Sequence, residues 1–294
     1  MKLTLPSPKS GSESRAGCNT PGVTVTRYSV GDATLVRVPY VDILVDAEVV
    51  GLTRPEVDAQ VGWAEPTWAS DGQVRVGAAV WIIESDGRRI VVDPTQAADD
   101  ILRGDDAALH QAAVADALAA AGYPRESIDT VLASHIDGIG MIAWRDGDDW
   151  SPFFPNAELL ISRRERDAIA DDGPYLPSGR DAFLALDAAG AVTAVDDSHA
   201  VTPTVELTWV GAHSPGHSLI NVGSGDTTGA TFLGHLALSP LHCAIGDVGG
   251  HIDPIAANDV LRTLADGRLL VGPLWPTPGA IRWTGAEITT ATPD

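Results

Sequence analysis

Hydrophobic residues in the first hundred positions recur mainly at the spacing of short β-strands. The β-like runs cover residues 23–30, 33–40, 41–50, 73–85 and 88–95. The last two runs are joined by a turn at Asp86-Gly87, and this arrangement predicts a hairpin that ends before Pro94. Residues 52–72 carry turn residues and tryptophans, and we expect a loop there.

Beyond residue 100, helical and strand-like patterns alternate. The Ala-rich stretch 107–121 has apolar residues spaced near 3.6 and predicts a helix. Residues 157–172 predict a strand followed by a helix, residues 254–266 predict a helix, and 173–200 are weakly patterned. The remaining predicted strands are 127–135, 205–212, 218–225, 230–238, 268–277 and 280–285. Strands in both halves with helices between them favour two packed sheets with helices outside, in one α/β unit.

The composition limits the classes of protein to which this chain can belong. The chain has 294 residues, 44% of them hydrophobic, so it is long enough for one large core. A net charge of -21 makes nucleic acid and anionic membranes poor partners. Two cysteines outside any CxxC pair fit a reducing cytoplasm. We expect residues 1–20 to be a disordered leader or a cloning remnant and residues 21–294 to form a single domain.

Three segments share one design, in which a strand ends in a histidine beside Gly or Pro. They are "TVLASHIDGIG" with His135 and Asp137, "GAHSPGHSLINV" with His213 and His217, and "TFLGHLALSPLHC" with His235 and His242. Histidine and carboxylate are common ligands of zinc and iron. Alternate residues of an extended strand face the same side, so His135 and Asp137 can share one ion. The coincidence of three such strand ends favours a metal site.

A lone histidine is more often structural than metal-binding. We interpret His110 and His199 in this way, and His251 stays open. His213 is expected to support the site or to be structural. Asp93, at the end of a strand, has the simpler interpretation of a turn cap.

The same segments, together with "IVVDPT", resemble the metallo-β-lactamase fold superfamily in sequence order over roughly residues 30–285. "HSPGHS" resembles the superfamily's G-H-T-P-G-H segment and is the most specific match, while "ASHIDGIG" stands in the place of its HxHxDH motif. The resemblance implies an αββα sandwich of two mixed β-sheets, with helices on the outer faces. It also implies that loops at the strand ends hold metal at one edge of the sandwich.

The chain departs from that motif at several positions. Asp137, Ile139 and Gly140 replace its second His, its Asp and its last His. His235 replaces the bridging Asp, and Leu274 stands where the final metal-binding His would fall. An imidazole bridges two ions poorly, so we expect one metal ion and not two. The ligand set predicted by the resemblance is His135, Asp137, His217 and His235.

By the same resemblance, one divalent ion, with zinc favoured and iron as the alternative, implies a mononuclear hydrolase of a small ester, lactone, thioester or amide. The candidates for the general base are Asp137, His242 and Glu65. Four ligands could also close a structural site. A non-hydrolytic iron or zinc enzyme of secondary metabolism and an inactive ligand binder are the alternatives.

Aromatic side chains near the predicted loops are candidates for contact with a small-molecule substrate. They are Trp63, Trp68, Trp144 and Phe153, with Trp150 and Phe154 at the same entrance. Tryptophan is more often a packing residue, so burial in the core is the competing interpretation. The sequence leaves the oligomeric state open, with a dimer among the options.

Overall fold

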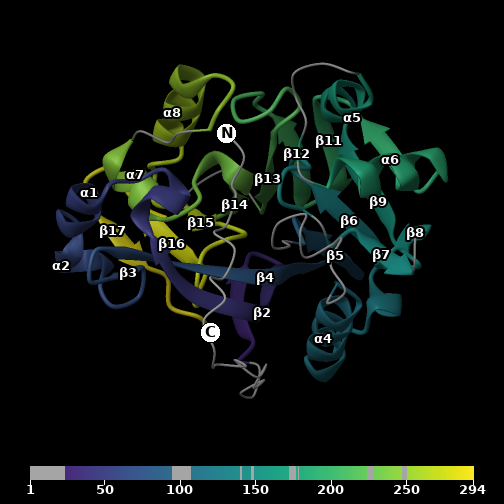
Figure 1. Cartoon of the computed structure of the whole chain (residues 1–294), viewed down its shortest axis with the longest axis horizontal. Helices are drawn as coiled ribbons and strands as arrows, with labels where there is room; N and C mark the ends of the chain where they lie inside the picture. The colour runs from purple at the N-terminus through teal and green to yellow at the C-terminus, as the bar shows by residue number, and fades with distance from the viewer. Residues whose placement is uncertain are drawn as a thin grey trace, which may run out of the picture.

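A computed structural model describes residues 24–94, 107–139, 141–146, 149–171, 177, 179–223, 228–246 and 250–294. Two large β-sheets occupy the middle of the molecule, and helices lie on both sides of them (Figure 1). The predicted αββα sandwich of two mixed sheets is therefore confirmed. The predicted leader over residues 1–20 lies outside the described part of the chain.

The first sheet is built from strands between residues 26 and 195. Its strand order is β1-β2-β4-β5-β6-β9-β10, and β3 pairs with β4. The strands are β1 (Thr26–Val30), β2 (Ala33–Asp46), β3 (Ala69–Ser70), β4 (Gln73–Ser85), β5 (Arg88–Val92), β6 (Thr130–Ala133), β9 (Glu158–Ser162) and β10 (Val192–Val195). Pairing is antiparallel up to β5 and parallel from β5 to β10. Parallel pairing places the carboxyl ends of β5, β6 and β9 at one edge.

The second sheet is built from the C-terminal half, in the order β11-β12-β13-β14-β15-β16-β17. Its strands are β11 (Ser198–Thr202), β12 (Val205–Trp209), β13 (Ser218–Val222), β14 (Ala230–Phe232), β15 (Leu269–Val271), β16 (Ala280–Trp283) and β17 (Ile288–Thr290). Only β14 and β15 pair in parallel. A separate hairpin pairs β7 (Ala143–Asp146) with β8 (Asp149–Pro152).

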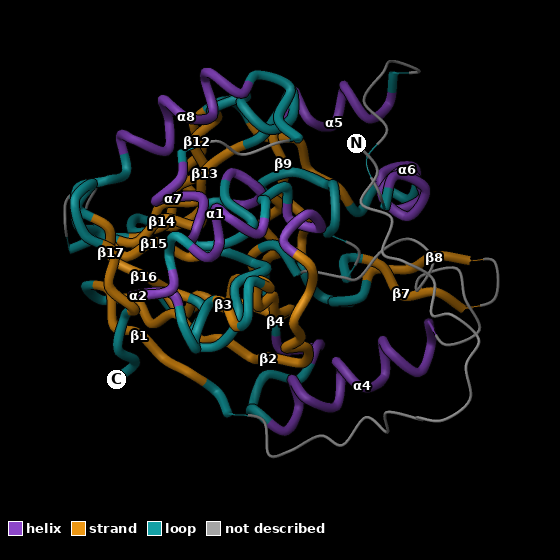
Figure 2. Tube along the Cα trace, turned by 60° about the vertical axis from the view of Figure 1, so that its left-hand side comes forward, coloured by secondary structure: helices purple, strands orange, loops and turns teal. Residues whose placement is uncertain are grey.

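The helices form two groups, which lie on opposite sides of the sheets in Figure 1. One group consists of α4 (Ala107–Ala120), α5 (Arg163–Ala170) and α6 (Arg180–Ala188). The other consists of α1 (Arg54–Asp58), α2 (Val61–Ala64), α7 (Leu241–Ile245) and α8 (Pro254–Thr263). In the tube of Figure 2, α8 lies at the upper left of the strands and α4 at their lower right. None of the described helices combines the length and apolar character needed to cross a membrane.

Alternation along the strands explains how the layers form. On β4, Trp81 and Ile83 belong to the apolar cluster between the two sheets, where they meet residues such as Phe232 of β14. Val80 and Ile82 face the other way and pack in the cluster that includes residues of α4. Successive strand residues point to opposite faces, so an almost continuous apolar run serves two cores.

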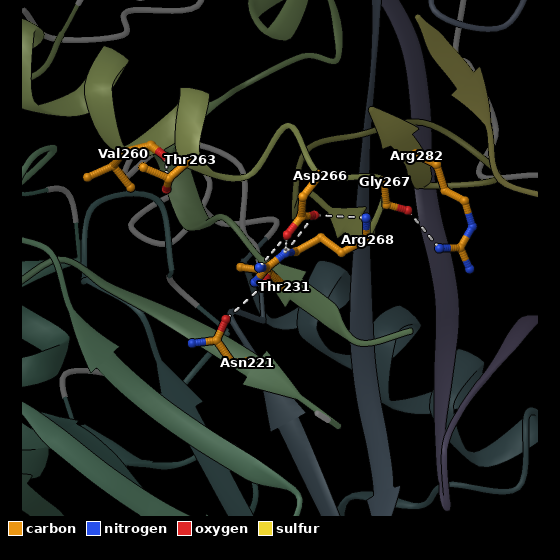
Figure 3. Close-up of polar contacts among 8 residues, drawn as sticks. All are labelled: Asn221, Thr231, Val260, Thr263, Asp266, Gly267, Arg268 and Arg282. Atoms are coloured by element: carbon orange, nitrogen blue, oxygen red, sulfur yellow. Dashed lines mark hydrogen bonds and ion pairs between the residues drawn. The ribbon is translucent and has the colours of Figure 1, made fainter. Parts of the chain in front are cut away.

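A polar ladder fixes the register of the second sheet near the start of β15 (Figure 3). The Arg268 guanidinium lies 2.6 Å from an Asp266 carboxylate oxygen and donates to the Thr231 hydroxyl at 3.3 Å. Thr231 in turn donates to the Asn221 side chain at 2.9 Å. These contacts join β13, β14 and the entry to β15, and so help to set where β14 ends and the following loop begins.

Most strongly patterned elements match the prediction, including the β4–β5 hairpin and helices α4 and α8. The two runs predicted over 33–40 and 41–50 instead form one long strand, β2, followed by a 3-10 helix at Ala47–Val50. The loop expected over 52–72 contains α1, α2 and β3. The weakly patterned stretch 173–200 contains α6, β10 and the start of β11, because burial of Phe183 and Leu186 stabilises a helix with little sequence signal.

Candidate metal centre

Histidines from three separate loops come together at one edge of the sandwich. His135 follows β6, His213 lies between β12 and β13, and His235 lies in the 3-10 helix Gly234–Leu236 after β14. Their ring centroids are 4.3 Å (His135–His235), 4.9 Å (His135–His213) and 5.4 Å (His213–His235) apart. One nitrogen from each of these three side chains lies within 4.8 Å of the other two. We call these three residues the histidine triad.

His135 is oriented by a hydrogen-bond chain that starts at Asp93. The buried Asp93 carboxylate accepts from the backbone N–H and the hydroxyl of Ser134, both at 2.7 Å. Because the Ser134 hydroxyl donates to Asp93, it accepts from Nδ1 of His135 at 2.8 Å. Nε2 then carries the lone pair, and it has no hydrogen-bond partner among the described residues. A buried imidazole nitrogen left in this state is typical of a metal ligand.

A second histidine, His251, supports His213. The Nδ1 atoms of the two rings lie 3.1 Å apart, so one of them donates to the other. The chain around His251 is held in place by backbone bonds, since Ile252 N–H donates to His213 O and Asp253 N–H donates to Ala212 O. His251, which the sequence left open, is therefore a direct neighbour of the triad.

Two of the four predicted ligands lie beside the triad and not within it. His217 is buried, and its Nε2 donates to Leu233 O at 3.1 Å. Its Nδ1 has no hydrogen-bond partner in the described structure, and its ring lies 5.6 Å from that of His135. Asp137 is half-buried and lies close enough to raise the pKa of His235 by its charge. The closest group thus contains His135 and His235, which the sequence predicts as ligands, together with His213; Asp137 and His217 stay predictions as ligands.

Glycines allow these loops to approach one another. A Cβ atom on Gly138 would lie 2.8 Å from Cε1 of His235, and one on Gly234 would lie 2.8 Å from Nε2 of His217. Both glycines also have positive φ, of 78° and 54°. Larger side chains would push the histidines apart and strain the backbone.

Burial keeps the triad uncharged. It lowers the pKa of His135 and His213 well below the ordinary value, and the neighbouring histidines lower both further. Burial also lowers the pKa of His235, against the opposing charge of Asp137. Neutral imidazoles have the lone pairs that metal binding requires, so near pH 7 the triad is ready to bind an ion.

The two other candidates for the general base, His242 and Glu65, have different surroundings in the structure. Both ring nitrogens of the buried His242 bond to backbone: Ser239 N–H donates to Nδ1, and Nε2 donates to Val50 O, each at 3.1 Å. This leaves no ring nitrogen for general-base work in the described geometry. Glu65 accepts from the backbone N–H of Asp71 at 2.9 Å on the surface.

Two of the aromatic candidates lie in the hydrophobic cores. Trp68 and Phe153 have no exposed surface, because Trp68 packs edge-on against Trp275 and Phe153 packs among residues of the first sheet's outer core. They have no face open to a ligand. Trp63 and Trp144 are only partly buried and stay predictions as substrate contacts.

A surface hollow elsewhere contains no triad residue. It is lined by Arg163, Arg164, Asp167, Asp196, Asp197 and Ser198.

The sequence did not indicate Ser134 as a supporting residue, nor Glu165, whose buried carboxylate accepts from Ser214 and Gly216, and it gave His213 no ligand role. Ser134 could have been recognised from its place between a strand and His135. Glu165 lies in the charged stretch "SRRERD", where the pattern indicates only a solvated helix face.

No protein family model matches the chain, and no curated protein matches it. Solved structures do match. The lactonase AidC, described as a dizinc quorum-quenching enzyme, has a TM-score of 0.70 and 15% identity over 92% of this chain and 98% of its own. The hydrolase AbOPH of the β-lactamase superfamily has a TM-score of 0.69 and 17% identity over 93% and 100%.

A probable metal-dependent hydrolase from Staphylococcus aureus has a TM-score of 0.68 and 13% identity, covering 91% of this chain and 99% of its own. Sequence identities this low support a shared fold and give no information about the reaction. With almost the full length of each chain aligned, the chain has the metallo-β-lactamase fold.

Proposed function

We propose that this chain is a mononuclear metal-dependent hydrolase of a small ester, lactone, thioester or amide. The histidine triad would hold one divalent ion, with zinc favoured. The observation that carries the proposal is the buried Nε2 of His135, which lacks a hydrogen-bond partner in the described part of the chain, on a side chain that converges with those of His213 and His235. Three neutral histidines with an open fourth position are a known catalytic zinc arrangement.

A divalent ion bound there would lower the pKa of a water ligand toward about 7 and polarise a substrate carbonyl. The chain's own residues supply orientation and proton handling. Asp93 and Ser134 hold His135 in one tautomer, and His251 supports His213. Asp137, half-buried beside His235, is the carboxylate that we assign to accept a proton from the nucleophile.

Metal analysis of the protein as isolated, together with three variants, tests the ligand set. We expect about one zinc per chain in the wild type, and His213→Ala should weaken metal binding more than His217→Ala does. His110→Ala is the matched control and should keep wild-type metal content. The reverse order for His213 and His217 would restore the ligand set expected from the sequence, and equal metal content in all three variants would reject the site.

Activity is tested on a panel of small esters, lactones and thioesters, with and without a chelator. Lactones belong in the panel because AidC and other structural neighbours are described as lactonases. Chelator-sensitive hydrolysis supports the proposal. Tightly bound iron without hydrolysis would instead support a non-hydrolytic enzyme, and no bound metal would support a ligand binder.

A further inference from the structure

Glu165 is a fully buried carboxylate that joins two of the loops of the candidate metal centre. It lies in the first turn of α5, directly after β9. One carboxylate oxygen accepts from the Ser214 hydroxyl at 2.7 Å and from Gly216 N–H at 2.9 Å. The other accepts from Ile136 N–H at 3.2 Å. The three donors come from two loops that lie far apart in sequence.

These donors stand next to the ligand-bearing positions. Ile136 follows His135 directly, and Ser214 follows His213 directly. A carboxylate removed from water is tolerated only when several donors replace its hydration, and here the two histidine loops supply them. The distance between the two histidine loops therefore depends on the Glu165 side chain.

Helix α5 packs closely against the loop that carries His213 and His217. A Cβ atom on Gly216 would collide with the backbone of Glu165, so only glycine lets the loop lie against α5. Arg164, the preceding residue of α5, places its guanidinium 4.2 Å from the centre of the Trp209 ring. Trp209 in turn donates from its indole N–H to Pro215 O at 3.0 Å. The first turn of α5 thus contacts the His213–His217 loop both directly and through Trp209.

We propose that Glu165 is a positioning residue that sets the geometry of the metal centre by holding His135 and His213 at a fixed separation. It acts through the backbone of the two loops and does not contact the metal position itself. The inference rests on the proposed metal site for its functional consequence. The clamp between the loops is a separate structural claim that can be measured on the metal-free protein.

Glu165→Ala and Glu165→Gln test the functional part, with the exposed Asp167→Asn of the same helix as control. Outer residues that orient metal ligands typically change metal affinity by about 10- to 100-fold when replaced. We expect Glu165→Ala to weaken zinc binding by roughly that factor, measured by competition with a chromophoric chelator. Glu165→Gln keeps the shape and one acceptor oxygen, so it should fall between Ala and wild type. Asp167→Asn should match the wild type.

The visible spectrum of the cobalt(II)-substituted protein separates positioning from simple loss of stability. A shifted absorption in Glu165→Gln, at a temperature where the variant is fully folded, indicates altered ligand geometry. A spectrum and zinc affinity identical to those of the wild type would overturn the proposal. Ser214→Ala removes a single donor and provides the same readout if Glu165→Ala does not fold.

Hydrogen exchange on the metal-free protein tests the clamp independently. We expect faster exchange of the Ile136 and Gly216 amides in Glu165→Gln, while amides in the β4–β5 hairpin keep their rates. If the wild type binds no metal but this exchange pattern holds, the proposed function fails and the clamp stands. If metal binds normally and the exchange rates do not change, the clamp is wrong and the proposed function is unaffected.

Discussion

The histidine triad and His242 are two buried histidine regions of the same molecule that differ in what their ring nitrogens contact. Burial lowers the pKa of every histidine involved, and it brings that of His242 to about 4. In His242 both ring nitrogens bond to backbone and connect the Val50 and Ser239 loops. In His135 one nitrogen is bonded to Ser134, and the other has no such partner within the described residues.

Burial and a lowered pKa therefore do not distinguish a metal site from a structural histidine in this chain. The distinction comes from accounting for each ring nitrogen, combined with the convergence of several rings. One unpartnered nitrogen is not sufficient, because His110 on α4 also has one and lies edge-on to Tyr40, outside the triad. The triad differs from His110 in bringing three histidine side chains to one point.

The largest expected contrast is between His135→Ala and His242→Asn. His135→Ala removes one of the three proposed ligands, so we expect zinc affinity to fall by more than about 100-fold. His242→Asn should keep zinc affinity and lower the free energy of unfolding by about 1–3 kcal/mol, because Val50 O loses its donor. Chelator competition and urea denaturation measure the two effects. Comparable loss of zinc in both variants would erase the distinction between the two regions.

A smaller effect is expected at Asp93, which acts on the triad through Ser134. Asp93→Asn keeps the shape of the side chain and tolerates the positive φ of 39°. The amide can turn only one acceptor oxygen toward Ser134, which disturbs the hydrogen bonds that fix the His135 tautomer. We expect zinc affinity to fall by roughly 10- to 100-fold, measured by the same chelator competition.

Asp129→Asn is the control for Asp93→Asn, since Asp129 accepts a backbone bond from Arg89 at the surface and lies away from the histidines. Its zinc affinity should equal that of the wild type. If Asp93→Asn also matched the wild type, the chain from Asp93 to His135 would have no role in metal binding.

The sequence predicted the parts of the site that depend on strand ends. A histidine within a few residues of the end of a buried strand lies near the sheet edge, so the sequence could place His135 and His235 together. The strand and helix patterns favoured two packed sheets with helices outside, and the resemblance to the metallo-β-lactamase fold supplied the αββα sandwich. The strand and helix patterns depend on local periodicity, which a single sequence carries.

The choice between His213 and His217 could not be predicted, because both lie in one short loop whose shape depends on distant residues. Glu165 and Trp209 lie outside that loop and hold it by hydrogen bonds with Ser214 and Pro215. Similarly, α6 depends on tertiary burial of Phe183 and Leu186 and left little local signal. Where long-range contacts determine the conformation of a segment, the local sequence pattern does not predict it.

The smallest expected effect concerns how the two regions respond to acid. The pKa of His242 is about 4 in the folded protein against 6.5 ordinarily, so below pH 6.5 the unfolded chain takes up a proton that the folded chain excludes. Stability therefore falls as the pH drops, and at pH 5.5 this one group should account for about 1 kcal/mol relative to pH 7.5. His242→Asn lacks the titrating group, so its free energy of unfolding should fall by about that much less, measured by urea denaturation of metal-free protein at both pH values. The triad histidines are present in both proteins and cancel in the difference. Identical pH dependence would mean that burial does not hold His242 neutral in the folded protein, and it would remove the structural half of the comparison.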